Sequence, residues 1–270
     1  MKTLFTGHRG FLGRELIPEL VKEFEVYMFE GDLRNFDQLS AYVSANKIDR
    51  IIHAAVRGGR RFKVDDYSVL EENLASSINA LRLDLPMIAF CSGAIYGRQK
   101  NILNAKEEKA GSLFPEDFYG QSKFLFRQLV KGDSDVSLLR FFNVFGVLET
   151  PERFLRTNIS HYWNRQPMKV FRDFYMDFFY VQDSIPILLS WLSGEKIPNE
   201  MNLVYQEKFL LSEICSKINN FGPYRVEIEI DEREHGSDYC GDGSILASMG
   251  LDLKGLDYGV QTMLNYYRVN

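Results

Sequence analysis

Cysteine is scarce in this chain, and the few cysteines are widely spaced. The 270 residues include only three, Cys91, Cys215 and Cys240, with no Cys-x-x-Cys pair among them. This spacing argues against both a disulfide framework and a structural zinc site. The four histidines also form no pair at metal-ligand spacing, so we expect no metal. Unpaired cysteines are typical of a reducing compartment, and we expect a cytoplasmic protein.

The sequence also lacks long hydrophobic runs and an excess of positive charge. The apolar runs are all shorter than the roughly 18 residues of a membrane span, and the run after Lys2 is too short for a signal-peptide core. Lysine and arginine total 32 against 37 aspartates and glutamates, which gives a net charge of -5. This balance supplies no basic field for a polyanion. We therefore expect neither a membrane nor a nucleic-acid partner.

Glycine and proline are few, 20 and 8 residues, and 45% of the chain is apolar, which is typical of a globular protein. In the first half, short apolar runs alternate with stretches of helical periodicity. The runs at 4–6, 26–29, 51–53, 87–90 and 136–142 predict strands, and the stretches between them predict helices. Strands that are apolar throughout and separated by helices form parallel sheets covered on both faces. The sequence therefore predicts a doubly wound α/β fold of the Rossmann type.

A glycine-rich turn directly follows the first predicted strand and opens the first helix. It reads Gly7-His8-Arg9-Gly10-Phe11-Leu12-Gly13. Glycines at such a junction allow a tight turn and let the helix N-terminus meet a pyrophosphate. The pattern by itself also fits an ordinary turn, but its position favours a dinucleotide site. The Gly-x-x-Gly-x-x-Gly spacing resembles that of the extended short-chain dehydrogenase/reductase superfamily.

Two charged residues bear on the identity of the dinucleotide. Glu30 ends the second predicted strand, where a carboxylate accepts from an adenosine ribose hydroxyl and favours NAD. Arg9 in the glycine turn favours NADP, because its guanidinium suits a 2′-phosphate. Asp32-Leu33 resembles the acidic and hydrophobic pair that frames the adenine in the superfamily. NADP and NAD both stay open, with a slight preference for NADP.

A candidate catalytic set follows later in the chain. Tyr119 and Lys123 are four residues apart and therefore lie on one face of the predicted helix. A nearby cation stabilises the phenolate, so Tyr119 could act as acid or base near neutrality. Ser92 follows a buried predicted strand, where its hydroxyl could hold a substrate oxygen. A Tyr-x-x-x-Lys pair alone is common by chance. Its combination with the glycine turn favours a catalytic role over a surface pair.

These motifs together resemble the epimerase/dehydratase family, the nucleotide-sugar branch of that superfamily. The resemblance covers nearly the whole chain and implies a nucleotide-binding domain over 1–146 and a smaller, substrate-binding region over 147–270. A segment near 178–193 is expected to return to the sheet. By resemblance, the cofactor contacts also include Ala54, Ala55, Asn73, Tyr119 and Lys123, and the substrate contacts are Ser92, Asn143, Asn158 and Arg172. The resemblance also implies a homodimer, with the helices at 67–82 and 119–130 as candidate interfaces.

Within this family, three runs look most like those of GDP-fucose synthases, which reduce a 4-keto sugar with NADPH: Gly7-His8-Arg9-Gly10, Ala55-Val56-Arg57-Gly58-Gly59 and Glu72-Asn73-Leu74. Those enzymes also epimerise, using a cysteine two positions after the catalytic serine, and Ala94 stands there in this chain. Alanine cannot move a carbon-bound proton, so we expect reduction without epimerisation. A nucleotide-sugar 4-epimerase with tightly bound NAD is the second hypothesis. A non-catalytic protein that binds a nucleotide sugar or cofactor is the third.

The substrate region departs from the family at one position. The family pattern has an arginine that grips the substrate diphosphate, and Met176 replaces it here. Arg172 in the same loop could substitute, since a guanidinium binds phosphate well, but an exposed surface arginine is an equal alternative. A basic stretch nearby contains Arg57, Arg60, Arg61 and Lys63. It could face a diphosphate, or it could be a solvated turn.

Overall fold

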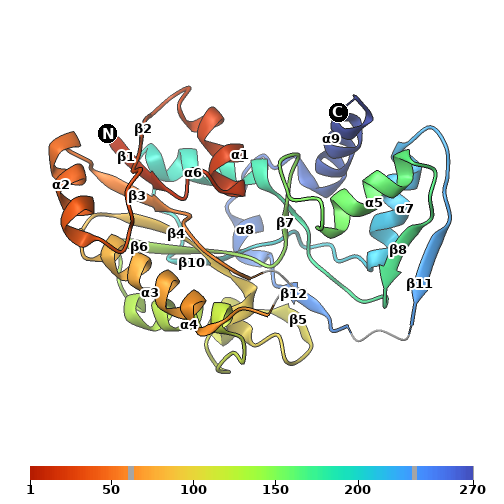
Figure 1. Cartoon of the computed structure of the whole chain (residues 1–270), viewed down its shortest axis with the longest axis horizontal. Helices are drawn as coiled ribbons and strands as arrows, with labels where there is room; N and C mark the ends of the chain where they lie inside the picture. The colour runs from red at the N-terminus through yellow and green to blue at the C-terminus, as the bar shows by residue number, and fades with distance from the viewer. Residues whose placement is uncertain (60–63, 233–235, 270) are drawn as a thin grey trace.

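The computed structural model describes residues 1–59, 64–232 and 236–269, and it is built around a six-stranded parallel sheet (Figure 1). The strand order across the sheet is β2-β1-β3-β4-β6-β10. In chain order these strands are β1 (Lys2–Thr6), β2 (Glu25–Met28), β3 (Arg50–His53), β4 (Met87–Ser92), β6 (Val136–Phe141) and β10 (Glu200–Leu203). The predicted parallel α/β architecture is confirmed.

Helices cover both faces of the sheet. One face carries α2 (Phe36–Asn46), α3 (Tyr67–Leu81) and α4 (Phe118–Val130), and the other carries α1 (Phe11–Leu20), α6 (Ser184–Leu192) and the short α8 (Ser244–Ser248) (Figure 1). Neighbouring strand residues point to opposite faces. Leu4 and Ile51 accordingly pack in the core under the first set of helices, and Phe5 and Ile52 pack in the core under the second. Both faces are buried, which explains why the strands are apolar throughout.

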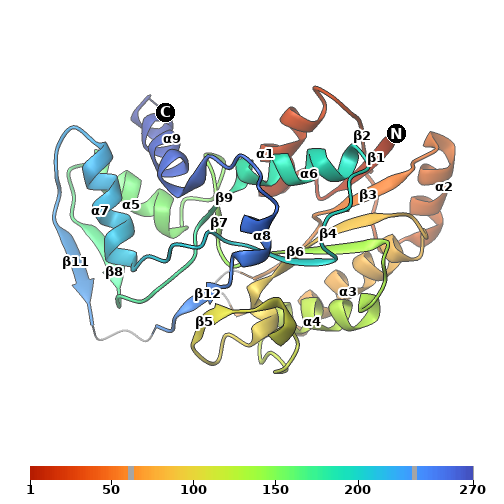
Figure 2. The same cartoon turned by 180° about the vertical axis from the view of Figure 1, so that it is seen from behind.

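The C-terminal half of the chain builds a second core beside the sheet (Figure 2). Its helices are α5 (Phe154–Trp163), α7 (Leu211–Phe221) and α9 (Gly255–Val269), and its two-stranded sheet pairs β8 (Met168–Phe171) with β11 (Ile228–Asp231). Two smaller pairs lie between the cores: β7 (Val144–Phe145) with β9 (Phe179–Tyr180), and β5 (Ile102–Ala105) with β12 (Tyr239–Gly241). Short 3₁₀ helices are η1 (Gly93–Tyr96), η2 (Glu107–Lys109) and η3 (Val181–Asp183).

The segment near 178–193 crosses back from the second core to the sheet. Its β9 pairs with β7 outside the central sheet, and its helix α6 packs against α1 on a face of that sheet. The strand that joins the central sheet is β10, which comes later in the chain. At the crossing, Asp183 accepts from the backbone N–H groups of Lys254 and Gly255, both at 2.8 Å, and so caps the start of α9.

The strand order places a topological switch point between β1 and β3. The chain leaves β1 toward β2 on one side and continues to β3 on the other side. In open α/β sheets, ligands bind outside the carboxyl ends of the strands at such a point. The glycine turn follows β1 and therefore lies at this position.

No helix in the described parts of the chain is long and apolar enough to cross a membrane.

Candidate active site

The glycine turn packs tightly against the end of β3. Gly7 has a φ of 75°, and a Cβ at this position would lie 2.6 Å from the Ala55 nitrogen. A Cβ on Gly13 would lie 2.4 Å from the His8 carbonyl oxygen. Only glycine fits either position, so the turn stays close to the residues Ala54 and Ala55 that the sequence assigns to the cofactor.

The turn also leaves the start of α1 open to an anion. The Gly10 N–H donates to Gly7 O at 2.9 Å, and Gly10 precedes the helix with no side chain to cap it. The first N–H groups of a helix lack partners inside the helix, and the helix dipole favours negative charge there. The N–H groups of Phe11, Leu12 and Gly13 therefore fit the pyrophosphate of a dinucleotide.

The two residues that bear on cofactor choice contact each other. The Arg9 guanidinium forms an ion pair with the Glu30 carboxylate, and His8 Nε2 lies 3.1 Å from the other Glu30 oxygen. Both side chains are exposed, at 78% for Arg9 and 61% for Glu30. Glu30, which favours NAD, and Arg9, which favours NADP, therefore form one exposed ion pair just after β2.

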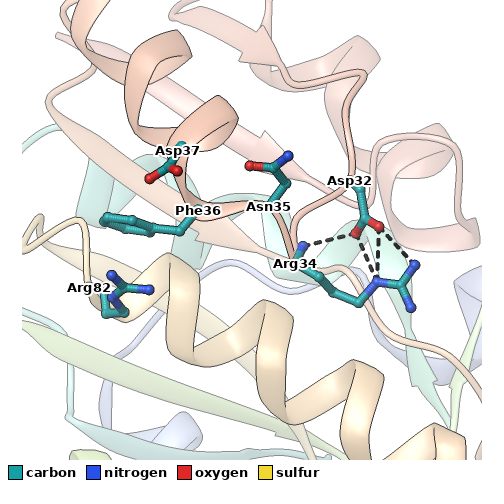
Figure 3. Close-up of a pocket in the computed structure, with 6 residues that line it drawn as sticks. All are labelled: Asp32, Arg34, Asn35, Phe36, Asp37 and Arg82. Atoms are coloured by element: carbon teal, nitrogen blue, oxygen red, sulfur yellow. Dashed lines mark hydrogen bonds and ion pairs between the residues drawn. The ribbon is translucent and has the colours of Figure 1, made fainter.

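A pocket of about 550 Å³ opens at the start of α2 (Figure 3). It is lined by Asp32, Arg34, Asn35, Phe36, Asp37 and Arg82. The Arg34 guanidinium binds both Asp32 oxygens at 2.7 and 3.0 Å, and this contact lowers the pKa of Asp32. Asn79 of α3 donates to the Leu33 carbonyl oxygen at 3.0 Å. The predicted Asp32-Leu33 pair is therefore fixed by ionic and backbone contacts at the rim of this pocket.

Ser92 and Tyr119 meet at the end of β4. Ser92 is the last residue of that strand, and its Oγ accepts from Ala94 N at 3.2 Å, which caps η1. Tyr119 lies in the first turn of α4, which Asp117 caps by accepting from Gly120 N at 2.7 Å. A hydrogen bond between the Tyr119 and Ser92 side chains acts to lower the pKa of the phenol.

Burial dominates the electrostatics of this pair. It raises the pKa of Tyr119 to about 12, against the lowering that its spacing from Lys123 predicts. Lys123 is 6% exposed, and its Nζ donates to the Phe90 carbonyl oxygen at 2.9 Å. Burial also lowers the pKa of Lys123. In this structure the phenol is held in its protonated form.

A glycine loop before α3 packs on the Tyr119 ring. A Cβ on Gly59 would lie 2.8 Å from ring carbons of Tyr119. Asn73, expected to contact the cofactor, holds this loop: it accepts from Arg57 N at 2.8 Å and donates to Arg57 O at 2.9 Å. Its amide also donates to Ser122 Oγ at 3.3 Å. The basic positions Arg60, Arg61 and Lys63 lie outside the described residues.

His53, just before the two alanines, is a core residue. Its Nδ1 lies 2.9 Å from Thr6 Oγ1 and its Nε2 lies 3.1 Å from Ser77 Oγ. Burial lowers the pKa of His53 to about 3, so the ring is neutral near pH 7. Within the described residues no group of three or more His, Cys, Asp or Glu side chains is arranged to hold a metal ion.

The three expected substrate contacts beyond Ser92 lie in different surroundings. Asn143 follows β6, and its amide lies between the Met176 sulfur, 3.5 Å away, and the Arg153 guanidinium. Asn158 is 1% exposed, and its amide bonds the Lys169 N–H at 2.7 Å and the Lys169 carbonyl at 3.2 Å. These bonds hold α5 against β8 in the second core.

Arg172, the third of these residues, follows β8 with a left-handed φ of 58°. It is exposed, and its backbone N–H donates to Asp231 O at 2.9 Å. This bond continues the pairing between β8 and β11 by one residue. The structure therefore places Arg172 at an exposed end of the second core.

Two arginines near the site were missed by the sequence analysis. Arg98 lies with its guanidinium carbon 5.8 Å from the Tyr119 ring centre and binds Asp117 at 2.6 Å. Arg153 contacts Asn143 and lies 5.8 Å from the Phe11 ring centre. Arg98 directly follows the Ser92-to-Gly97 run, which is the one signal that points to it. Arg153 lies in a stretch without periodicity, where spacing gives no signal.

A glycine turn at the switch point of a Rossmann-like sheet, together with a serine at the end of β4 and a tyrosine and a lysine on α4, is typical of Rossmann-fold NAD(P)-binding proteins. Residues 3–203 match the model of the NAD dependent epimerase/dehydratase family. This chain belongs to that family. Its members are NAD(P)-dependent oxidoreductases and epimerases that act on nucleotide sugars.

Similar proteins include both epimerases and reductases. An ADP-L-glycero-D-manno-heptose-6-epimerase from Brachyspira hyodysenteriae is 25% identical over 183 residues, which cover 61% of this chain and 56% of that protein. The chain spans about half the length of the curated relatives it matches.

Two solved structures show the same fold over nearly the whole chain. A GDP-mannoheptose C4 reductase from Campylobacter jejuni with NADP bound has a TM-score of 0.83 at 17% identity, covering 99% of this chain and 98% of that chain. A GDP-L-fucose synthetase from Naegleria fowleri has a TM-score of 0.82 at 17% identity, covering 100% and 93%. At this identity the likeness concerns the fold.

We predict that Gly7→Ala weakens dinucleotide binding, because the new methyl group would displace the turn from Ala55. The positive φ alone costs about 1 kcal/mol, and the contact adds to it. Gly132→Ala is the matched control, since Gly132 has a φ of 86° and its Cβ would meet no atom within 4 Å. Calorimetric titration with NADPH and NAD should show about tenfold weaker binding for Gly7→Ala only. Equal affinities in the two variants would contradict this role of Gly7.

Proposed function

We propose that this protein is an NAD(P)H-dependent reductase of a nucleotide-linked 4-keto sugar. The observation that carries the proposal is the half-buried Tyr119, whose phenol interacts with Ser92 at the end of β4 and whose pKa is raised by desolvation to about 12, so that it keeps its proton. A protonated phenol suits the donation of a proton to an alkoxide that forms from a ketone. Family membership supports the nucleotide-sugar class of substrate.

In this mechanism each residue has a distinct task. A bound NAD(P)H supplies the hydride. Ser92 and Tyr119 hold the ketone oxygen by donating hydrogen bonds, and Tyr119 then gives its proton to that oxygen. Lys123, on the same face of α4, would bind the nicotinamide ribose and stabilise the phenolate left behind. Its ammonium donates one hydrogen to the Phe90 carbonyl at 2.9 Å and has two more for these tasks.

A 4-epimerase is the second candidate, because the same three residues suffice for hydride removal and return. In that reaction Tyr119 must first act as a base, and its high pKa disfavours this role in the structure as it stands. Ala94 is fully buried and carries no acid or base, so we propose no epimerisation at carbons beside the ketone. A binding protein without catalysis is the third candidate, but it has no need of a buried phenol paired with a serine.

We further propose a cytoplasmic homodimer. The three cysteines are free and buried, as is common in a reducing compartment. Helices α3 and α4 pack side by side and leave Tyr67 and Leu129 more than half exposed. Large exposed apolar side chains on adjacent helices favour association with a second copy.

We expect Tyr119→Phe to abolish turnover while it leaves cofactor affinity nearly unchanged. Loss of a positioned acid costs about 100- to 10,000-fold in rate. Oxidation of NADPH at 340 nm with GDP- and dTDP-linked 4-keto sugars measures this effect. Tyr258→Phe, which alters a half-exposed tyrosine of α9, serves as the control. Turnover of Tyr119→Phe within a few fold of the wild-type rate would overturn the assignment.

The cofactor carried by the purified protein separates reductase from epimerase. A reductase must release its oxidised cofactor after each turnover, so we expect little retained dinucleotide and ready uptake of NADPH. Mass spectrometry of the denatured protein's extract measures the retained amount. Stoichiometric NAD, together with conversion of UDP-glucose to its 4-epimer, would instead establish the epimerase.

We also propose that NADP is the preferred dinucleotide, with Arg9 as its 2′-phosphate ligand. Glu30→Gln should tighten NADPH binding because it frees Arg9 and removes a negative charge. Arg9→Gln should weaken it about three- to tenfold, a modest effect because the site is exposed. Glu25→Gln, at the start of β2, is the control. Fluorescence titration with NADPH and NADH measures the ratio, and an unchanged ratio in both variants would rule out this pair as the discriminator.

A further inference from the structure

Arg153 reaches from the start of α5 into the region between the glycine turn and the end of β6. Its Nη2 donates to the Asn143 side-chain oxygen and to the Val144 carbonyl oxygen. Its guanidinium carbon lies 5.8 Å from the ring centre of Phe11, the residue that follows Gly10. One cation therefore lies between the cofactor turn and the residue expected to contact the substrate.

Glu149 fixes the orientation of this cation. The carboxylate is 1% exposed, lies 3.1 Å from Arg153 Nε and accepts from Arg156 N at 3.0 Å. The Arg153 side chain itself is 35% exposed. Within the described residues, its bonds use Nε and Nη2 and leave the two Nη1 hydrogens without a protein acceptor. A guanidinium that is held on one edge and open on another is suited to a phosphate oxygen.

Arg153 also lies close to the position where the family pattern has its diphosphate arginine. Met176 occupies that position, and its sulfur is 3.5 Å from Asn143 Nδ2. The oxygen of the same amide accepts from Arg153. One side chain, Asn143, therefore separates the methionine from the guanidinium. Met176 is 6% exposed and has no charge to offer an anion.

We propose that Arg153 supplies the guanidinium that binds the diphosphate of the nucleotide-sugar substrate, and so replaces the arginine absent at Met176. This inference rests on the proposed function, because it requires a nucleotide-sugar substrate. The cofactor dinucleotide also carries a pyrophosphate, to which a guanidinium could bind in the same way. We assign Arg153 to the substrate because the start of α1 already provides N–H groups for the cofactor. Arg153 instead bonds Asn143 and Val144, which follow β6.

The test measures the binding of UDP, ADP, GDP, dTDP and CDP to the full-length protein by calorimetry, with NAD and NADPH as a separate series. Arg153→Gln should weaken the tightest nucleoside diphosphate about 10- to 100-fold, the loss of a charged hydrogen bond or two. Arg153→Lys should recover part of the affinity, because a lysine keeps the charge without the planar fork. NAD and NADPH affinities should change less than about threefold.

Arg156→Gln is the matched control. It removes the same charge from the same helix, but Arg156 packs over the Tyr267 ring at 4.6 Å. We expect its diphosphate affinity to stay near the wild-type value. Arg172→Gln tests the competing arginine in parallel. Circular dichroism and thermal unfolding establish that each variant is folded, and Arg153→Lys keeps the test decisive if Arg153→Gln does not fold.

Three results would overturn the proposal. The first is wild-type diphosphate affinity in Arg153→Gln, or a loss that follows Arg172→Gln instead. The second is a loss confined to NAD and NADPH, which would assign Arg153 to the cofactor. The third is a wild-type protein that binds none of the five diphosphates at millimolar concentrations. Failure of the proposed reaction is distinguishable, since it appears as turnover in Tyr119→Phe while diphosphate binding still depends on Arg153.

Discussion

The burial of both faces of the central sheet is the constraint on which the rest of this structure depends. Leu4 and Phe5 are neighbours in β1, yet they belong to two different cores on opposite sides of the sheet. A sheet covered in this way leaves little room for polar groups along its strands. The polar chemistry is therefore concentrated where the strands end. Ser92 closes β4 and Asn143 follows β6, so both lie at the same edge as the glycine turn.

The second core is tied to this edge by buried carboxylates. Glu15 of α1 is 5% exposed and accepts from Leu148 N at 2.7 Å and from Gln182 Nε2 at 2.9 Å. Asp183 caps α9 and accepts from the Tyr205 hydroxyl. Each carboxylate is satisfied by groups from distant parts of the chain, as a buried charge requires. These bonds fix how α5 and its Arg153 approach the glycine turn, so the substrate side depends on contacts far from it in sequence.

The sequence was sufficient for the fold, because local periodicity and glycines that tolerate no side chain determine it. It did not indicate the hydrogen-bond partners of the amides. Asn73 and Asn158 occur in motifs that resemble ligand contacts, but long-range bonds to Arg57 and Lys169 engage them. Spacing along a chain does not report which backbone groups a folded chain brings near. For the same reason Arg153 was missed, since its surroundings are assembled from α1, β6 and the loop before α5.

The balance of burial and charge at Tyr119 sets the pKa of its phenol. Spacing alone pairs the phenol with Lys123, yet the ammonium is directed at the Phe90 carbonyl. The cation over the ring is instead Arg98, anchored by Asp117 at the start of α4. Its attraction lowers the pKa of Tyr119, but burial has the larger effect and raises it. A phenol in this state donates a proton readily only when negative charge develops beside it, which is what hydride addition to a ketone produces. The same burial that stabilises the fold around β4 therefore keeps the proton on Tyr119 until negative charge develops beside it.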